Sequence, residues 1–294
     1  MASITTTPDH RLPCSPKHRG SVTALIWPAF VVLAFFGLPA LLLIRVSLAR
    51  RDPSVLEGTG WTLDSFAAAM DFSALNGFLQ SLQLAFAVAT VSTILAFPAV
   101  YFITRMRRSA QVAWLVGLLT TLALSEVLIT FAWQVVLSKR AGLSNIGVLL
   151  GLLDKTYSMT PSFYAVVACL VYVVIPLNAI MLYPSLSRID ASYMEVAATM
   201  GAKPWQAFFN VLIPLLKRPI ATGYLTAVVI SLGSYVAPLV LGSPSNWTIG
   251  VVISELATSA QNLPGASATA ILLLVMTLII IAAISRVGGK GYTS

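Results

Sequence analysis

The chain has 294 residues, of which 57% are hydrophobic and only 10% are charged, and its mean hydropathy is +0.87. Soluble domains carry charge at about a quarter of their positions, so this composition excludes an ordinary soluble protein and indicates several membrane spans. The net charge of +8 does not predict a nucleic-acid site, because the basic residues are scattered through short loops without interleaved aromatic clusters.

Residues that carry catalytic or metal-binding chemistry are sparse. Cys14 lies in a polar N-terminal tail and Cys169 in an apolar run, so the two predict no disulfide framework. His10 and His18 lie in the same tail as Cys14, and no phosphate-binding or nucleophile-elbow motif occurs in the sequence. We therefore expect no catalytic residue, no metal site and no cofactor.

Six apolar runs are long enough to cross a bilayer, which takes about 20 residues of helix. They cover roughly 22–44, 78–103, 112–136, 162–183, 220–241 and 266–285. The length of the first run favours a retained span over a cleaved signal peptide. We expect a flexible cytoplasmic tail at 1–21, a six-helix transmembrane domain at 22–286 and a C-terminal tail at 287–294.

The distribution of positive charge predicts the orientation. Six spans place both termini on one side, and placing them inside leaves 12 of the 18 Lys and Arg residues on that side. The positive-inside rule then favours cytoplasmic termini. The fold class predicted is an all-α membrane protein, with a cytoplasmic loop at 188–219.

That loop is too polar to be a span, and its pattern predicts two short helices. Ser192 and Glu195 have the spacing of a capping box that opens the first helix. One apolar face follows at helical spacing, formed by Tyr193, Val196, Ala197 and Met200. Gly201 is placed to end this helix in a left-handed conformation. Pro204 begins a second helix, which ends near Pro214.

The stretch from 195 to 220 resembles the EAA loop of permease subunits in binding-protein-dependent ABC importers. Glu195-Val196-Ala197 stand at the Glu-Ala-Ala positions, Gly201-Ala202 at the Gly-Ala, Phe208 at the aromatic, and Ile213-Pro214 at the pair before the fifth span. Val196 departs from the usual Ala, and Arg218-Pro219 stand where the family has Pro-Gly.

Within these permeases the chain is similar to the spermidine/putrescine-type branch. The stretches that carry this similarity are Tyr172–Pro176, Leu186–Asp190, Gly233–Gly242, Phe131–Trp133 and Pro264–Ala266. Ile129 departs from the branch, which often has an Arg there.

The resemblance implies a type I importer permease in a bacterial inner membrane, with ATP hydrolysis on a separate subunit. It implies three partners: a dimer of cytoplasmic ATPase subunits, a second permease and a periplasmic substrate-binding protein. The solute expected is small and amine-bearing, such as a polyamine, an opine or an amino-acid-like compound. The residues expected to couple the loop to the ATPase are Ser192, Glu195, Val196, Ala197, Met200, Gly201, Ala202, Phe208 and Pro214.

Glu126 is the acidic residue deep inside a predicted span, and buried carboxylates in membranes are costly and functional by default. It predicts a cation-favouring substrate path; the alternative is a position near the outer interface or pairing with a basic residue. The other expected path residues are Trp133, Ser231, Ser234 and Tyr235, although small hydroxylated residues also serve helix packing. Glu195 either closes the capping box, contacts the ATPase, or does both.

Two other interpretations of the chain remain. A stand-alone secondary transporter or channel would need no ATPase. A loop lying on the membrane surface is disfavoured, because residues 191–202 contain no Lys or Arg.

Overall fold

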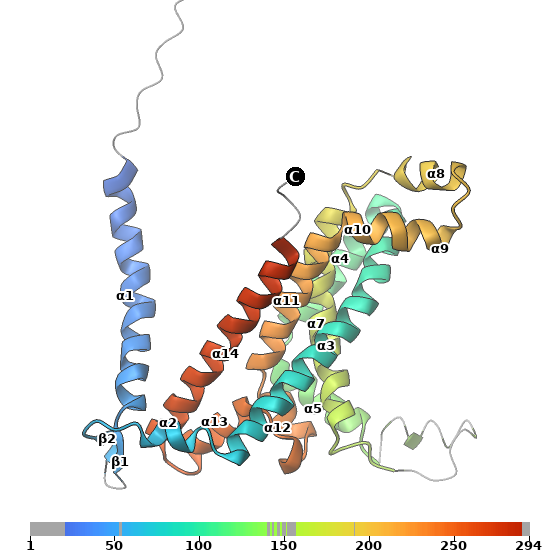
Figure 1. Cartoon of the computed structure of the whole chain (residues 1–294). Coiled ribbons are helices and arrows are strands. Elements are labelled where there is room, and N and C mark those ends of the chain that lie inside the picture. Colours follow the sequence, from blue (N-terminus) through green and yellow to red (C-terminus); the bar gives the residue numbers. More distant parts are fainter. Residues whose placement is uncertain are drawn as a thin grey trace, which may run out of the picture. The chain divides into compact units, whose positions relative to one another are not determined.

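A computed structural model describes residues 21–52, 55–139, 142, 144–145, 148, 151, 157–190 and 192–289 (Figure 1). Most of the predicted N-terminal tail, with His10, Cys14 and His18, lies outside these residues, and the predicted C-terminal tail is described only to Gly289. The chain forms two units, Met1–Arg45 and Val46–Ser294.

Helix α1 (Ser21–Ser47) makes up the described part of the first unit and extends two residues into the second. Its stretch Phe30–Ser47 is long and apolar enough to cross a membrane, which confirms the helix predicted at 22–44.

The second unit begins with a small antiparallel hairpin of β1 (Arg50–Asp52) and β2 (Val55–Thr59), in which Arg50 pairs with Thr59. The short helix α2 (Asp64–Ala68) follows. The hairpin is a departure from the all-α prediction, which gave this region no regular structure. A hydrogen bond from Nη2 of Arg51 to the carbonyl of Ala260 (3.1 Å) ties it to the turn before the last helix.

Three further long helices match predicted spans: α3 (Phe72–Arg105), α7 (Phe163–Leu186) and α14 (Leu263–Gly289). Each contains a stretch long and apolar enough to cross a membrane. Pro98 in α3 and Pro176 in α7 lie inside these helices without ending them.

The third predicted span, 112–136, is not one helix. It consists of α4 (Arg108–Ala123) and α5 (Glu126–Val136), with a bend of 94° between them. No proline or glycine marks the break. Leu124 and Ser125 are extended, and the Ser125 side chain makes no capping hydrogen bond. Glu126 lies in the first turn of α5, where the helix dipole favours an acidic side chain, so the new helix opens at this polar pair within an apolar run.

The fifth predicted span, 220–241, is also broken. Helix α11 (Lys217–Gly233) ends before Ser234, and α12 (Val236–Leu241) starts after Tyr235. Pro238 explains the position, since its ring clashes with the carbonyl four residues earlier, at Ser234, while the first turn of a new helix accepts it. The sequence predicts one continuous span at 220–241, whereas the structure has two helices there.

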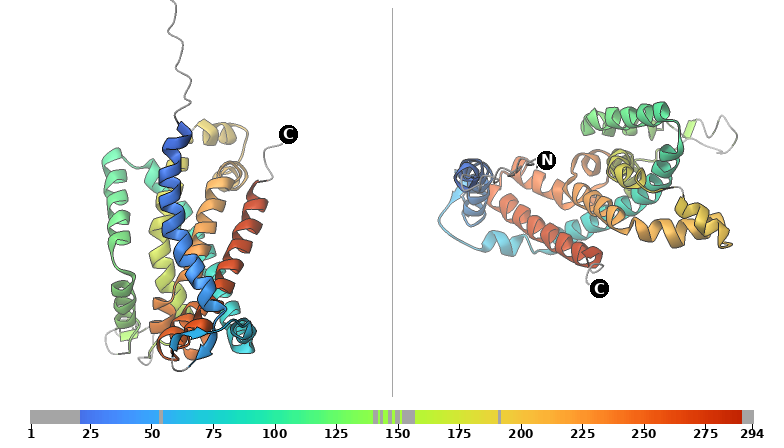
Figure 2. Two further views of the ribbon diagram at one scale, coloured as in Figure 1. Left: turned by 90° about the vertical axis from the view of Figure 1, so that its left-hand side faces the viewer. Right: turned by 90° about the horizontal axis from the view of Figure 1, so that it is seen from above.

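Two segments complete the second unit: the loop between α7 and α11, and the segment between α12 and α14. The loop contains α8 (Ser192–Thr199), α9 (Pro204–Ala207), the π-helical turn η1 (Phe208–Leu212) and α10 (Ile213–Leu215). After α12 come a 3₁₀ turn η2 (Pro244–Asn246) and α13 (Ile249–Thr258). Within the second unit, α8–α10 lie at one end and α12, α13 and the hairpin at the other (Figures 1 and 2).

The centre of the second unit is the packing of α3 against α7 and α11. A buried polar contact links them: Nδ2 of Asn178 in α7 donates to Oγ of Ser92 in α3 (3.1 Å). The N-terminus of α13 is held by α3 as well, because the N–H of Ile249 donates to Oγ of the buried Ser81 (2.8 Å). The described residues thus contain four helices that qualify as spans alone. The number rises to six if two bent pairs each count as one span, namely α4 with α5 and Trp205–Leu215 with α11, the second pair bent by 74°.

Candidate functional site

Helix α8 of the 188–219 loop is capped at both ends. The N–H of Ser192 donates to Oδ1 of Asp190 (3.0 Å), so Asp190 takes the capping role that the sequence assigned to Glu195. The reason is local. An Asp just before the first turn accepts an N–H that has no partner within the helix, and its negative charge is attracted by the positive end of the helix dipole. Because the N–H of Ser192 is bonded to Asp190, the predicted capping box is wrong in its partner, and the Glu195 side chain is exposed.

The C-terminal cap is the one that the sequence predicts. Gly201 has φ of +84°. Its N–H donates to the carbonyl of Ala198 (3.0 Å), and the N–H of Ala202 donates to that of Ala197 (3.0 Å). These two bonds form a Schellman motif, which satisfies carbonyls that the last turn of α8 leaves open.

The predicted apolar face of α8 splits into two parts. Ala197 is buried, with Met194 half-buried beside it, and these residues turn toward the rest of the loop. Tyr193, Val196 and Met200 are 53%, 57% and 83% exposed. An apolar surface of this kind, on a helix too short to be stable in water alone, indicates a surface that binds something else.

The second half of the loop is attached to the membrane helices by an aromatic contact. The ring of Phe208 packs edge-on against Phe97 and Tyr101 of α3, with ring centroids 5.3 and 5.9 Å apart. Leu212, one turn further, is buried in the same apolar cluster, whereas Pro214 is exposed. Phe208 therefore connects the loop to α3 and is only partly accessible from outside.

The two helix breaks meet at a second polar site. Oγ of Ser234, at the α11/α12 break, donates a hydrogen bond of 2.7 Å to Oε1 of Glu126, the first residue of α5. The two residues are 108 positions apart, and the sequence expectation for both was a place on the substrate path. The N-terminal end of α5 further stabilises a negative charge at Glu126.

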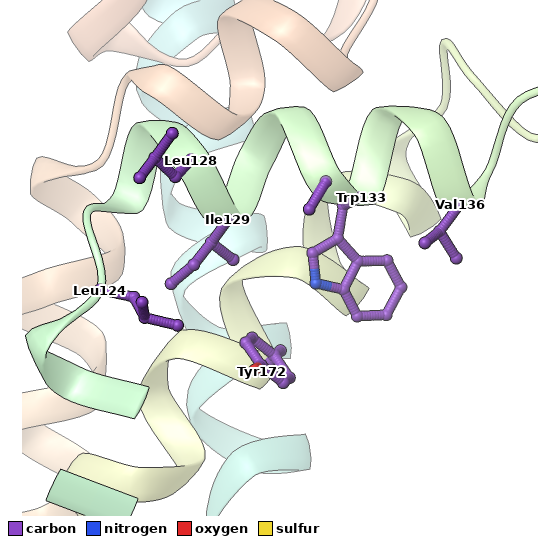
Figure 3. Close-up of a pocket in the computed structure, with 7 residues that line it drawn as sticks. Leu124, Leu128, Ile129, Trp133, Val136 and Tyr172 are labelled. Carbon is purple, nitrogen blue, oxygen red and sulfur yellow. The ribbon is translucent and has the colours of Figure 1, made fainter. Parts of the chain in front are cut away.

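An aromatic pair lies further along α5. The rings of Trp133 in α5 and Tyr172 in α7 are edge-on, with centroids 6.1 Å apart. They line a cavity of about 380 Å³ together with Leu124, at the end of α4, and apolar side chains of α5 such as Leu128 (Figure 3). The sequence pointed to Trp133, but nothing local distinguished Tyr172 from other aromatic residues in its helix.

Two further residues were expected on the path, Ser231 and Tyr235, and Tyr235 directly follows Ser234 in the chain. Ser231 is buried in α11, and Tyr235 is 46% exposed at the helix break. Sequence reasoning missed Ser81 and Asn178, whose partners lie 168 and 86 residues away. Among the described residues, no three His, Cys, Asp or Glu side chains lie close enough to hold a metal ion together.

The sequence of this chain is similar to those of known transport proteins. The spermidine/putrescine transport system permease protein PotB of Escherichia coli (strain K12) is 27% identical over 257 residues, which cover 87% of this chain and 91% of that protein. The putative 2-aminoethylphosphonate transport system permease protein PhnV of Salmonella typhi is 24% identical over 276 residues, covering 94% and 98% of the two chains.

Solved structures share the fold at low identity. A crystal structure of a bacterial ABC transporter involved in the import of the acidic polysaccharide alginate superposes with a TM-score of 0.75 and 16% identity, over 92% of this chain and 96% of that one. The MetNI methionine ABC transporter gives a TM-score of 0.54 at 16% identity, over 73% and 94%. The importer-permease fold expected from the sequence is confirmed.

The family model for "binding-protein-dependent transport system inner membrane component" matches residues 113–287, more than half of the chain. The protein therefore belongs to this family, as an inner-membrane permease subunit of an ABC importer.

Proposed function

We propose that the chain forms half of the translocation path for a small amine-bearing solute and is driven through its 188–219 loop by a separate cytoplasmic ATPase dimer. The observation that carries the coupling role is the exposed apolar surface of α8, formed by Tyr193, Val196 and Met200. A cleft on the ATPase would cover this surface and stabilise a helix that is marginal alone. Phe208 then passes a displacement of the loop to α3.

The substrate assignment rests on Glu126 and on the relatives. A carboxylate at the junction of two broken helices, held by Ser234, attracts a cation and repels an anion. The named relatives are described as permeases for spermidine and putrescine and, putatively, for 2-aminoethylphosphonate, which all carry an amino group. The aromatic pair of Trp133 and Tyr172 suits an alkylammonium group through cation–π attraction.

The other half of the path is proposed to come from a second permease, with the solute delivered by a periplasmic binding protein. Apolar side chains of α4 and α5, such as Trp114 and Phe131, are exposed in this chain and need either lipid or a partner subunit. We propose six spans, with both termini in the cytoplasm: α1, α3, α4 with α5, α7, α11 with α12, and α14.

The test is reconstitution of the permease with its ATPase, second permease and binding protein in proteoliposomes, followed by uptake of radiolabelled spermidine. Uptake should require ATP inside the vesicle, and competition should be strong for putrescine, weaker for 2-aminoethylphosphonate and absent for a neutral sugar. Uptake driven by an ion gradient without the ATPase would instead support a stand-alone secondary transporter. Equal competition by the neutral sugar would remove the amine assignment while leaving the coupling role intact.

A further inference from the structure

A second cavity lies where two membrane helices end. It has a volume of about 190 Å³. Its lining consists of Tyr101, Thr104 and Arg105 at the end of α3, Leu186 at the end of α7, Ser187 and Ile189 just after α7, and Leu212 of η1. The candidate spans of α3 and α7 finish at Arg105 and Leu186. We therefore expect the cavity at the depth where the hydrocarbon core gives way to lipid headgroups.

The cationic group of this cavity is held in place. Cζ of Arg105 lies 5.1 Å from the ring centroid of Tyr101, a cation–π contact that restricts the guanidinium. No acidic side chain lines the cavity. The nearest carboxylate in sequence to its lining, that of Asp190, accepts the N–H of Ser192. Arg107 and Arg108 follow directly and are exposed, which makes the surroundings more positive.

The rest of the lining suits a lipid better than a free ion. The hydroxyls of Thr104 and Ser187 donate to carbonyls of their own helices, so Arg105 supplies the donors that an anion needs. Leu186 and Leu212 give the cavity an apolar wall. Phe102 is 63% exposed and its ring lies 6.0 Å from that of Tyr101, so it offers contact to an acyl chain. The volume of the cavity equals that of about six water molecules, which is enough for a phosphate group and the neighbouring glycerol carbons.

We propose that this cavity binds the phosphodiester headgroup of an anionic phospholipid, with Arg105 as the phosphate ligand. Guanidinium is the preferred protein group for phosphate oxygens, and basic pockets between membrane helices recognise such headgroups. Tyr101 stacks on Arg105 from one side and packs against Phe208 from another. A bound headgroup therefore fixes the contact between α3 and the 188–219 loop, so that anionic lipid increases the coupling of the importer.

Lipid binding is measured directly, without reference to any transported solute. The purified full importer is titrated with phosphatidylglycerol or with phosphatidylcholine of the same acyl chains, and bound lipid is counted by native mass spectrometry. Arg105→Gln should weaken phosphatidylglycerol binding about fivefold, the effect of one basic group near a lipid surface. Arg105→Lys, which keeps the charge, should retain most of the binding and guards against misfolding of the Gln variant.

Arg108→Gln is the matched control, because Arg108 is exposed but does not line the cavity. An equal loss in both Gln variants would mean a diffuse charge effect and would overturn the proposal. Displacement of the lipid by millimolar inorganic phosphate would assign the site to a free anion instead. If Arg105→Gln leaves lipid binding unchanged but weakens ATPase association, the cavity receives an acidic side chain of the ATPase, and the lipid assignment is wrong.

Discussion

The backbone of Gly201 offers the sharpest test of the coupling role. Its φ of +84° lies in the left-handed region, and a Cβ built at this position has no heavy atom within 4 Å. Any substitution is therefore opposed by backbone conformation and not by crowding inside the chain. A left-handed conformation costs a residue with a Cβ about 1–2 kcal/mol, with a β-branched residue at the upper end and Asn well below it.

These costs translate into a graded series. If the ATPase binds α8 only with its Schellman turn formed, Gly201→Ala should weaken ATPase binding about fivefold and Gly201→Val about thirtyfold. Gly201→Asn should change it by about twofold or less. The affinity is measured between fluorescently labelled ATPase and the permease pair in nanodiscs, in the nucleotide-free state.

The matched control is Gly117 in α4, where a Cβ also meets open space but φ is not positive. Gly117→Val should leave ATPase binding unchanged. Wild-type affinity in Gly201→Val would refute the reasoning, since the turn would then be unnecessary. Equal losses for Asn and Val at position 201 would also refute it, because side-chain volume against the partner, and not backbone strain, would be the cause.

Three further outcomes are expected. Glu126→Gln keeps an acceptor for the hydroxyl of Ser234 but removes the negative charge, so the KM for spermidine uptake should rise about tenfold or more. An unchanged KM would count against the path role of Glu126. Phe208→Ala should lower stability by about 2–3 kcal/mol and uncouple ATP hydrolysis from uptake, whereas the 57% exposed Phe209→Ala should do neither; similar behaviour of the two variants would argue against a connecting role. Ser81→Ala leaves the N–H of Ile249 buried without its acceptor and should cost about 1–3 kcal/mol in thermal unfolding of the purified subunit, and a wild-type Tm would show that water replaces the hydroxyl.

Features whose signals are local were predictable from the sequence. Gly201 follows an apolar helical face and precedes a proline, and both the left-handed cap and the start of the second helix are confirmed. The first, second, fourth and sixth spans were found from hydrophobic length alone. Asp190, by contrast, was overlooked as the cap of α8 because Ser192 and Glu195 offered a more familiar pattern.

The breaks in two predicted spans were harder to foresee. Pro238 was a visible signal, yet prolines such as Pro176 lie inside α7 without ending it, so the residue type alone does not decide. At Ser125 an apolar run continues on both sides, so the local preference of Ser125 and Glu126 for a helix start is a weak signal, and the hydrogen bond of Glu126 with Ser234 adds a tertiary reason for the break. The contacts of Ser81 and Asn178 depend on partners far away in the sequence, which no local pattern encodes.

The uninterrupted course of α3 sets a constraint on how this chain can change its length. The helix uses Ser81 to hold α13, Ser92 to hold α7 and Phe97 to hold the 188–219 loop. Inserting one residue between Ser81 and Phe97 would turn one contact about 100° relative to the other. Seven added residues would nearly restore the angle, yet they would separate the contacts by a further 10 Å or so along the axis. Substitutions along the exposed side of α3 leave these contacts in place, whereas an insertion or deletion between Ser81 and Phe97 displaces at least one of them.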